Sequence, residues 1–148
     1  MQKILPFLWF DNNAEEALNY YVSIFPDAEI TAINRQTPDG PLFTGSFRIF
    51  NQNYGVLNGG SQFKFNEAIS FVVNCKDQTE VDYYWEKLCD GGKELMCGWL
   101  TDKYGITWQI IPEELPQLLN QPDAEKRKRA IDAMMQMKKI EIEVMKNA

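Results

Sequence analysis

An internal repeat of 64 residues is the feature that most limits how this chain can fold. Similar residues recur at this spacing, in the same order and among elements of the same kind. The matched pairs are Phe7 with Phe71, Asn13 with Asp77, Glu16 with Glu80, and Tyr20 with Tyr84. Self-similarity of this kind predicts two copies of one structural unit. The alternative is an ordinary α+β domain in which the spacing is coincidental.

The first copy has the pattern strand, helix and three strands. An apolar run over 4–10 predicts a buried strand, and Asn13 with Glu16 forms a capping pattern that opens a helix ending before Pro26. Three further strands are predicted, separated by turn sequences rich in Asn, Asp, Gly and Pro. They cover 29–35, 42–50 and 54–58.

The second copy repeats this order and is followed by a helical tail. A strand is predicted over 68–74, and Asp77 with Glu80 opens a second helix that Gly91 and Gly92 end. The remaining strands cover 94–96, 98–101 and 106–111. We therefore predict an α+β fold of paired βαβββ modules, 3–60 and 66–112, within a single domain of residues 1–148. The tail, 113–148, is predicted to be helical, although 140–144 also alternates like a strand.

Composition excludes several classes of function. The 148 residues, 45% of them hydrophobic, suit one domain with a core, and no run approaches the ~20 apolar residues of a membrane span. The net charge of −6 disfavours nucleic acid and anionic membranes as partners. The first residues lack the features of a secretory signal, and three cysteines without a CxxC pair suit a reducing cytoplasm. The absence of histidine removes the commonest general base and metal ligand.

Several segments resemble PhnB-like proteins, a branch of the vicinal-oxygen-chelate superfamily that also contains glyoxalases, bleomycin-resistance proteins and dioxygenases. The segments are Leu5-Pro6-Phe7-Leu8-Trp9-Phe10-Asp11, Leu57-Asn58-Gly59-Gly60, Asn66-Glu67-Ala68-Ile69-Ser70-Phe71, Cys97-Gly98-Trp99-Leu100, Trp108-Gln109-Ile110 and Met134-Met135-Gln136-Met137. The resemblance implies paired βαβββ modules, a homodimer, and ligand pockets in the concave faces of curved sheets. Some members of this branch are labelled 3-demethylubiquinone-9 3-methyltransferase. This sequence lacks a strand-linked glycine-rich GxGxxG loop, so it does not support that activity.

The resemblance also implies where a metal would bind in relatives that use one. Counted along the repeat, those positions hold Pro6, Asn58, Ser70 and Gln109. Proline offers no side-chain donor, and hydroxyls and amides are weak ligands beside imidazole, thiolate or carboxylate. We therefore expect no metal and no cofactor at these positions.

A pocket without a metal remains the expected site. Strand alternation, counted from those positions, directs Pro6, Leu8 and Phe10 into the cavity and Phe7 and Trp9 toward the helix. The same count directs Ser70, Val72, Asn74, Thr107, Gln109 and Ile111 inward, with Phe71, Val73, Trp108 and Ile110 behind. The pocket-lining candidates are Leu8, Asn58, Ser70, Cys97 and Gln109. The alternative is that these residues only fill the interior of a collapsed sheet.

Three hypotheses for function stay open. The chain is a metal-free small-molecule-binding protein, an enzyme whose acid and base are carboxylates, tyrosine or cysteine, or a dimeric interaction module without a ligand. No residue is assigned a catalytic role. Cys97 lacks a histidine to activate it, which favours a structural role for its thiol.

Overall fold

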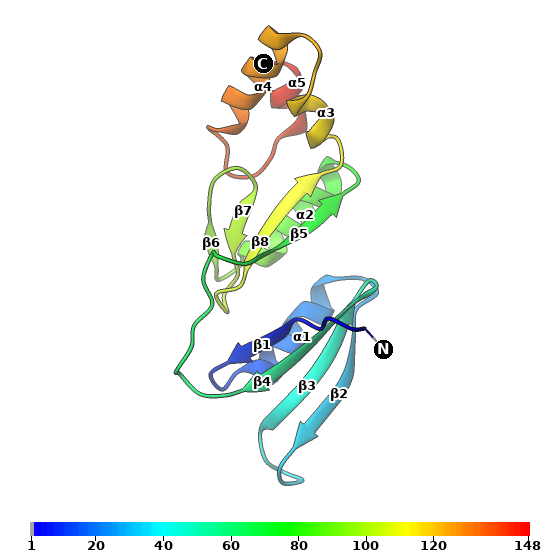
Figure 1. Cartoon of the computed structure of the whole chain (residues 1–148), viewed down its shortest axis with the longest axis vertical. Helices are drawn as coiled ribbons and strands as arrows, with labels where there is room; N and C mark the ends of the chain where they lie inside the picture. Colours follow the sequence, from blue (N-terminus) through cyan, green and yellow to red (C-terminus); the bar gives the residue numbers. More distant parts are fainter. Residues whose placement is uncertain (1) are drawn as a thin grey trace. The chain divides into compact units, whose positions relative to one another are not determined.

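The computed structural model describes residues 2–148 and divides the chain into two compact units. The first unit ends at Phe65 and the second comprises Asn66–Ala148 (Figure 1). Each unit contains one sheet and one helix that follows its first strand.

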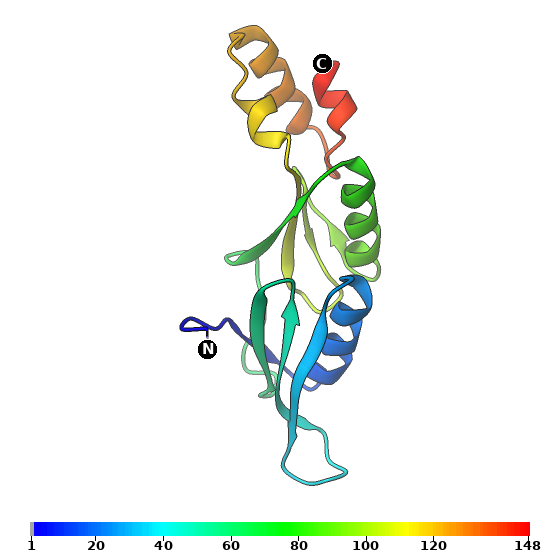
Figure 2. The same ribbon diagram turned by 90° about the vertical axis from the view of Figure 1, so that its right-hand side faces the viewer.

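The first unit contains a mixed sheet of four strands. Its elements are β1 (Phe7–Phe10), α1 (Ala14–Ile24), β2 (Glu29–Arg35), β3 (Leu42–Ile49) and β4 (Gln52–Asn58). The strand order is β1-β4-β3-β2, with β1 and β4 parallel and the other pairs antiparallel. Helix α1 packs on one face of this sheet (Figure 2), where Tyr21 stacks on Phe47 and Phe47 on Tyr54 at ring separations of 5.7 and 4.9 Å.

The second unit repeats this arrangement. Its elements are β5 (Ser70–Cys75), α2 (Gln78–Cys89), β6 (Lys93–Glu94), β7 (Trp99–Thr101) and β8 (Thr107–Pro112). The order β5-β8-β7-β6, again with a parallel outer pair, is the order of the first sheet. The predicted α+β fold of paired βαβββ modules is therefore confirmed. Buried residues of α2 lie at helical spacing, at Val81, Tyr84, Trp85 and Leu88.

The two predicted helix caps have different outcomes. Asp77 caps α2 as predicted, because its carboxylate accepts from the Glu80 amide at 2.9 Å. Asn13 stands at the N-cap of α1, where the sequence predicted the helix to open, but its side chain makes no capping hydrogen bond. Instead the Asn58 Oδ1 atom, at the end of β4, accepts from the Ala14 amide at 2.9 Å. Three residues separate β1 from α1, whereas two separate β5 from α2, and the longer connection leaves Asn13 out of capping geometry.

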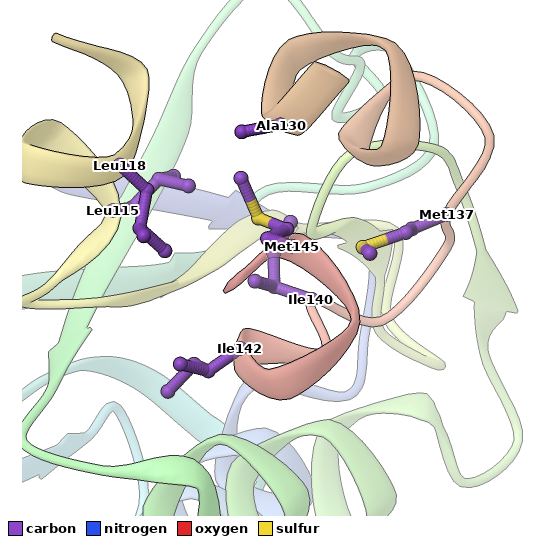
Figure 3. Packing of buried hydrophobic residues seen from close by; sticks show 7 residues of the cluster. All are labelled: Leu115, Leu118, Ala130, Met137, Ile140, Ile142 and Met145. Atoms are coloured by element: carbon purple, nitrogen blue, oxygen red, sulfur yellow. The ribbon is translucent and has the colours of Figure 1, made fainter. Parts of the chain in front are cut away.

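The tail is helical and has a small core of its own within the second unit. Its helices are α3 (Leu115–Leu119), α4 (Ala124–Met134) and α5 (Ile142–Lys146). Figure 3 shows apolar side chains of these helices and of the segment between α4 and α5 gathered around Met145 and Ile140. The buried members are Leu115, Leu118, Ala130, Met137, Ile140, Ile142 and Met145. Segment 140–144, whose sequence also alternates like a strand, forms no strand and instead leads into helix α5.

Hydrogen bonds attach the tail to the loop before β7 and to α2. The Cys97 and Gly98 amides donate to the carbonyls of Met137 and Lys138 at 2.9 and 2.7 Å. The Gln78 side chain donates to the Ile140 carbonyl at 2.9 Å and accepts from the Ile142 amide at 2.8 Å. These contacts fix the segment between α4 and α5 against the sheet region and α2 of the same unit.

Candidate functional site

The face of the second sheet that α2 does not cover carries a row of polar side chains. Val73 and Ile110 are paired and buried on the α2 side, so the residues that alternate with them point the other way. Ser70, Val72 and Gln109 therefore share the uncovered face, where the Val72 side chain is half exposed. This is the orientation that the sequence predicted for these three residues.

Ser70 and Gln109 are joined directly on this face. The Gln109 amide nitrogen donates to the Ser70 hydroxyl oxygen at 2.8 Å, between the two parallel strands β5 and β8. This bond leaves the serine O–H as a donor and the Gln109 Oε1 atom as an acceptor. Within residues 2–148 neither of these two groups has a hydrogen-bond partner in the structure. The pair therefore presents one neutral donor and one neutral acceptor side by side.

Thr107 lies next to Ser70 and adds a hydroxyl. The two residues are register partners, and the Thr107 side chain is almost fully buried. Its Oγ1 atom has no hydrogen-bond partner among the described residues. A buried hydroxyl without a partner costs free energy, about 1–3 kcal/mol in mutational studies. The Ser70 end of the row thus contains an unsatisfied polar atom.

These donors do not fit a metal ion. Ser70 and Gln109 carry a hydroxyl and a carboxamide, and Pro6 has no side-chain donor, whereas transition metals prefer imidazole, thiolate or carboxylate. The amide nitrogen of Gln109 already donates to Ser70. No group of three or more His, Cys, Asp or Glu side chains within residues 2–148 is placed to hold a metal ion.

In the first unit the predicted orientation of β1 is wrong. Leu8 is the register partner of Val56, and Val56 is the register partner of Gly45, so these three residues share one face of the sheet. A Cβ atom on Gly45 would lie 3.4 Å from the Leu18 side chain of α1, so this is the face that the helix covers. Leu8 and Phe10 are buried on this helix-covered side, whereas Phe7 is 54% exposed on the other. The cause is the extra residue between β1 and α1, because a shift of one residue exchanges the two faces of a strand.

Asn58 also belongs to the helix-covered side. Its amide nitrogen donates to the Leu42 carbonyl at 2.9 Å, while its oxygen caps α1. Asn58, Leu42 and Asn12 line a cavity of about 260 Å³ at this end of the sheet, beside the loop between β2 and β3. Both ends of the Asn58 amide are therefore occupied by the protein.

Sequence reasoning missed the role of two aromatic side chains on the uncovered face of the first sheet. Phe7 covers Gly55 and Trp9 covers Gly59, and each ring occupies the position of the missing Cβ atom. The Trp9 indole donates to the Gly60 carbonyl at 2.9 Å and meets the Phe63 ring edge to face at 4.9 Å. Gly59 and Gly60 thus leave room for the Trp9 side chain at the end of β4. Only Phe7 lies directly opposite its glycine, Gly55, across β1 and β4, whereas Trp9 lies opposite Leu57 and reaches Gly59 beyond the strand end, so no local pattern in the sequence indicated both contacts.

Cys97 contacts the tail. It precedes β7 with a φ of 59°, and its thiol is 3.6 Å from the Met134 carbonyl and 3.9 Å from the Met135 sulfur. Of the five predicted pocket residues, the structure joins only Ser70 and Gln109 by a direct hydrogen bond.

The other two cysteines are poor nucleophiles. Burial raises the pKa of the Cys75 thiol to about 12, helped by the nearby carboxylates of Glu80, Asp77 and Glu113. Burial, with the Glu94 carboxylate, raises the pKa of Cys89 to about 12 as well. Cys89 lines a cavity of about 540 Å³ with Trp85, Asp90 and Glu94, where its thiol stays protonated at neutral pH.

Comparison with known proteins gives one family. The family model described as 3-demethylubiquinone-9 3-methyltransferase matches residues 2–111. A PhnB protein from Bacillus cereus is 34% identical and superposes with a TM-score of 0.70, covering 75% of this chain and 99% of that chain. No curated protein matches the sequence.

More distant structures share the fold alone. Protein PA1353 from Pseudomonas aeruginosa is 18% identical with a TM-score of 0.63, covering 76% of this chain and 98% of its own. The fosfomycin resistance protein FosX from Listeria monocytogenes, complexed with Mn(II) and sulfate, is 13% identical with a TM-score of 0.56, covering 82% and 98%. None of the helices in residues 2–148 has the length and apolar character needed to span a membrane.

Proposed function

Because the chain belongs to the PhnB-like family described as 3-demethylubiquinone-9 3-methyltransferase, we propose that it binds a neutral small molecule on the uncovered face of its second sheet. The Ser70–Gln109 hydrogen bond is the observation that carries this proposal. It holds an amide and a hydroxyl in fixed positions and leaves one donor and one acceptor for a ligand. The half-exposed Val72 side chain beside them supplies apolar contact, as in most small-molecule sites.

The chemistry of the pair favours a carboxamide or a similar neutral group. A carboxamide offers a carbonyl oxygen to the Ser70 hydroxyl and an N–H to the Gln109 oxygen. A carboxylate has no N–H to offer, and the net charge of −6 opposes its approach. The ligand that we propose is therefore neutral and capable of both donating and accepting.

Binding at this face does not use a metal ion in our proposal. The FosX structure from Listeria monocytogenes contains Mn(II). The corresponding strand positions predicted in this chain hold Ser70 and Gln109, which lack the charge to hold such an ion. Methyl transfer is likewise not part of the proposal, because Gly59 and Gly60 form a strand end that seats Trp9.

We also propose that the chain acts as a homodimer, as the family resemblance implies, and that it works in the cytoplasm. All three cysteines are free, which suits a reducing compartment. Light scattering coupled to size-exclusion chromatography measures the state directly, and a monomer at micromolar concentration would contradict the dimer.

Benzamide and benzoate test the ligand class, since they have the same shape but differ in charge. We expect benzamide at millimolar concentration to raise the melting temperature, whether or not EDTA is present, and benzoate to have no effect. Ser70→Ala and Gln109→Ala should abolish the shift. The matched control is Asn34→Ala, because the Asn34 amide donates to the Thr44 hydroxyl at 3.1 Å on an exposed pair of strands in the first unit. Equal shifts in wild type and Gln109→Ala, or a requirement for a metal, would contradict the proposal.

A further inference from the structure

Two sulfur atoms, those of Cys97 and Met135, lie close together where the tail meets the loop before β7. Cys97 and Met96 lie in this loop, and Met134 and Met135 lie at the end of α4. The Cys97 thiol is 3.9 Å from the Met135 thioether, although 38 residues separate them in the sequence. Met135 is 55% exposed and Met96, next to Cys97 in the chain, is 44% exposed, so solvent reaches the contact between Cys97 and Met135.

The backbone holds the two sulfur-bearing segments together. The amides of Cys97 and Gly98 donate to Met137 and Lys138, which fixes the loop to the chain just after α4. The Cys97 thiol also lies 3.6 Å from the Met134 carbonyl. The position of the thiol relative to Met135 is therefore set by main-chain contacts on both sides.

We propose that Cys97 and Met135 bind one Cu(I) ion. Thiolate and thioether are soft ligands, which select Cu(I) among biological metals, whereas zinc sites are usually completed by four cysteine or histidine ligands. Two metal–sulfur bonds of about 2.3 Å that span the observed separation enclose an angle of about 115° at the metal. This angle is far from linear, so the metal has room for a third ligand besides the two sulfur atoms.

Binding involves proton release and no change of oxidation state. Cu(I) displaces the thiol proton of Cys97 to the solvent, the thiolate forms the first bond to the metal, and the Met135 sulfur donates a lone pair for the second. The site shares no residue with the Ser70–Gln109 pair, and Met135 lies outside the residues 2–111 that the family model matches.

Competition with the chromophoric chelator bicinchoninate tests the proposal on the full chain, with ascorbate present to keep copper reduced. We expect the protein to remove one equivalent of Cu(I) from the chelator, and X-ray absorption of the complex to show sulfur neighbours at about 2.3 Å. Cys97→Ser should abolish this uptake, and Met135→Leu should weaken it by about tenfold or more.

Two variants serve as matched controls. Cys89→Ser removes another free cysteine, and Met137→Leu removes a thioether of the same tail whose side chain lies in its core. Both should take up Cu(I) as the wild type does. No uptake by the wild type, or equal uptake by the Cys97→Ser variant at an unchanged melting temperature, would overturn the proposal. The benzamide-induced shift should persist in Cys97→Ser, which separates this test from that of the sheet site.

Discussion

Asn58 at the end of β4 caps helix α1 by accepting a hydrogen bond from the Ala14 amide at 2.9 Å, across 44 positions of sequence. The same side chain donates to the Leu42 carbonyl at 2.9 Å, so one amide joins the helix, β4 and the start of β3. The local candidate for the cap, Asn13, makes no such bond.

Replacing Asn58 by alanine should therefore destabilise the protein, whereas replacing Asn13 should not. We expect Asn58→Ala to lower the free energy of unfolding by about 2 kcal/mol, because a cap and a second hydrogen bond are both lost. Asn13→Ala should change it by less than about 0.5 kcal/mol. Urea denaturation measures both, and a larger effect at Asn13 would show that the cap is local.

A second prediction concerns the buried Asp102. Its carboxylate accepts from the Trp108 indole at 2.9 Å and from the amides of Tyr104 and Ile106 at 2.8 and 3.1 Å. Asp102→Ala leaves these donors without this acceptor, so we expect a loss of about 3 kcal/mol in unfolding free energy and a change in tryptophan fluorescence. The exposed Asp11→Ala is the control and should stay within about 0.5 kcal/mol of wild type. A similar loss at the two positions would argue against a special role for the buried carboxylate.

A third prediction concerns acid stability of the contact between the tail and α2. Hydrogen bonds from Gln78 and then Lys139 lower the pKa of Asp82 below its ordinary value of 3.8. A lowered carboxylate pKa contributes stability above the unfolded value, and this contribution is lost as pH falls through the folded one. The Lys139 ammonium lies 2.9 Å from the Asp82 carboxylate, and this contact raises the pKa of Lys139 above its ordinary value of 10.5. The stability that the charged Lys139 contributes is therefore lost only in strong alkali.

We expect Asp82→Asn to lower stability at pH 6 by only a few tenths of a kcal/mol, because the pair is partly exposed, and to have a smaller effect at about pH 2. Urea midpoints at the two pH values measure the difference. Glu86→Gln removes the same charge from α2, where Glu86 forms no ion pair among the described residues, and should not show this pH dependence. An Asp82→Asn effect that is equal at both pH values would contradict the assignment.

The fourth prediction concerns the order in which the cysteines react. Cys75 is fully buried, and the pKa of both Cys75 and Cys89 is raised to about 12, so at pH 8 only about one in ten thousand of these thiols is ionised. Iodoacetamide should therefore label the partly exposed Cys97 first in the folded protein. Mass spectrometry of peptides gives the order, and in urea all three should react alike. Labelling of Cys89 before Cys97 would contradict it.

The sequence predicted most of the elements because their signals are local. Apolar spacing placed α1 and α2, the Asp77–Glu80 pattern identified a true cap, and the repeat predicted two sheets with the same strand order. The sequence also predicted correctly that Ser70 and Gln109 share a face. That prediction depended on the length of the connection between β5 and α2, which agrees with the length found in the structure.

The sequence alone determined the paired βαβββ architecture, because periodicity and helix caps depend on residues that are close in the chain and the repeat is visible in the order of the residues. Only the tertiary structure decided which face of β1 is covered and which residue caps α1. Side chains alternate along a strand, so one additional residue in the connection 11–13 reverses the orientation of Leu8 and leaves the cap to Asn58. The meeting of Cys97 with Met135 was likewise decided by backbone contacts between distant segments, which no local pattern encodes.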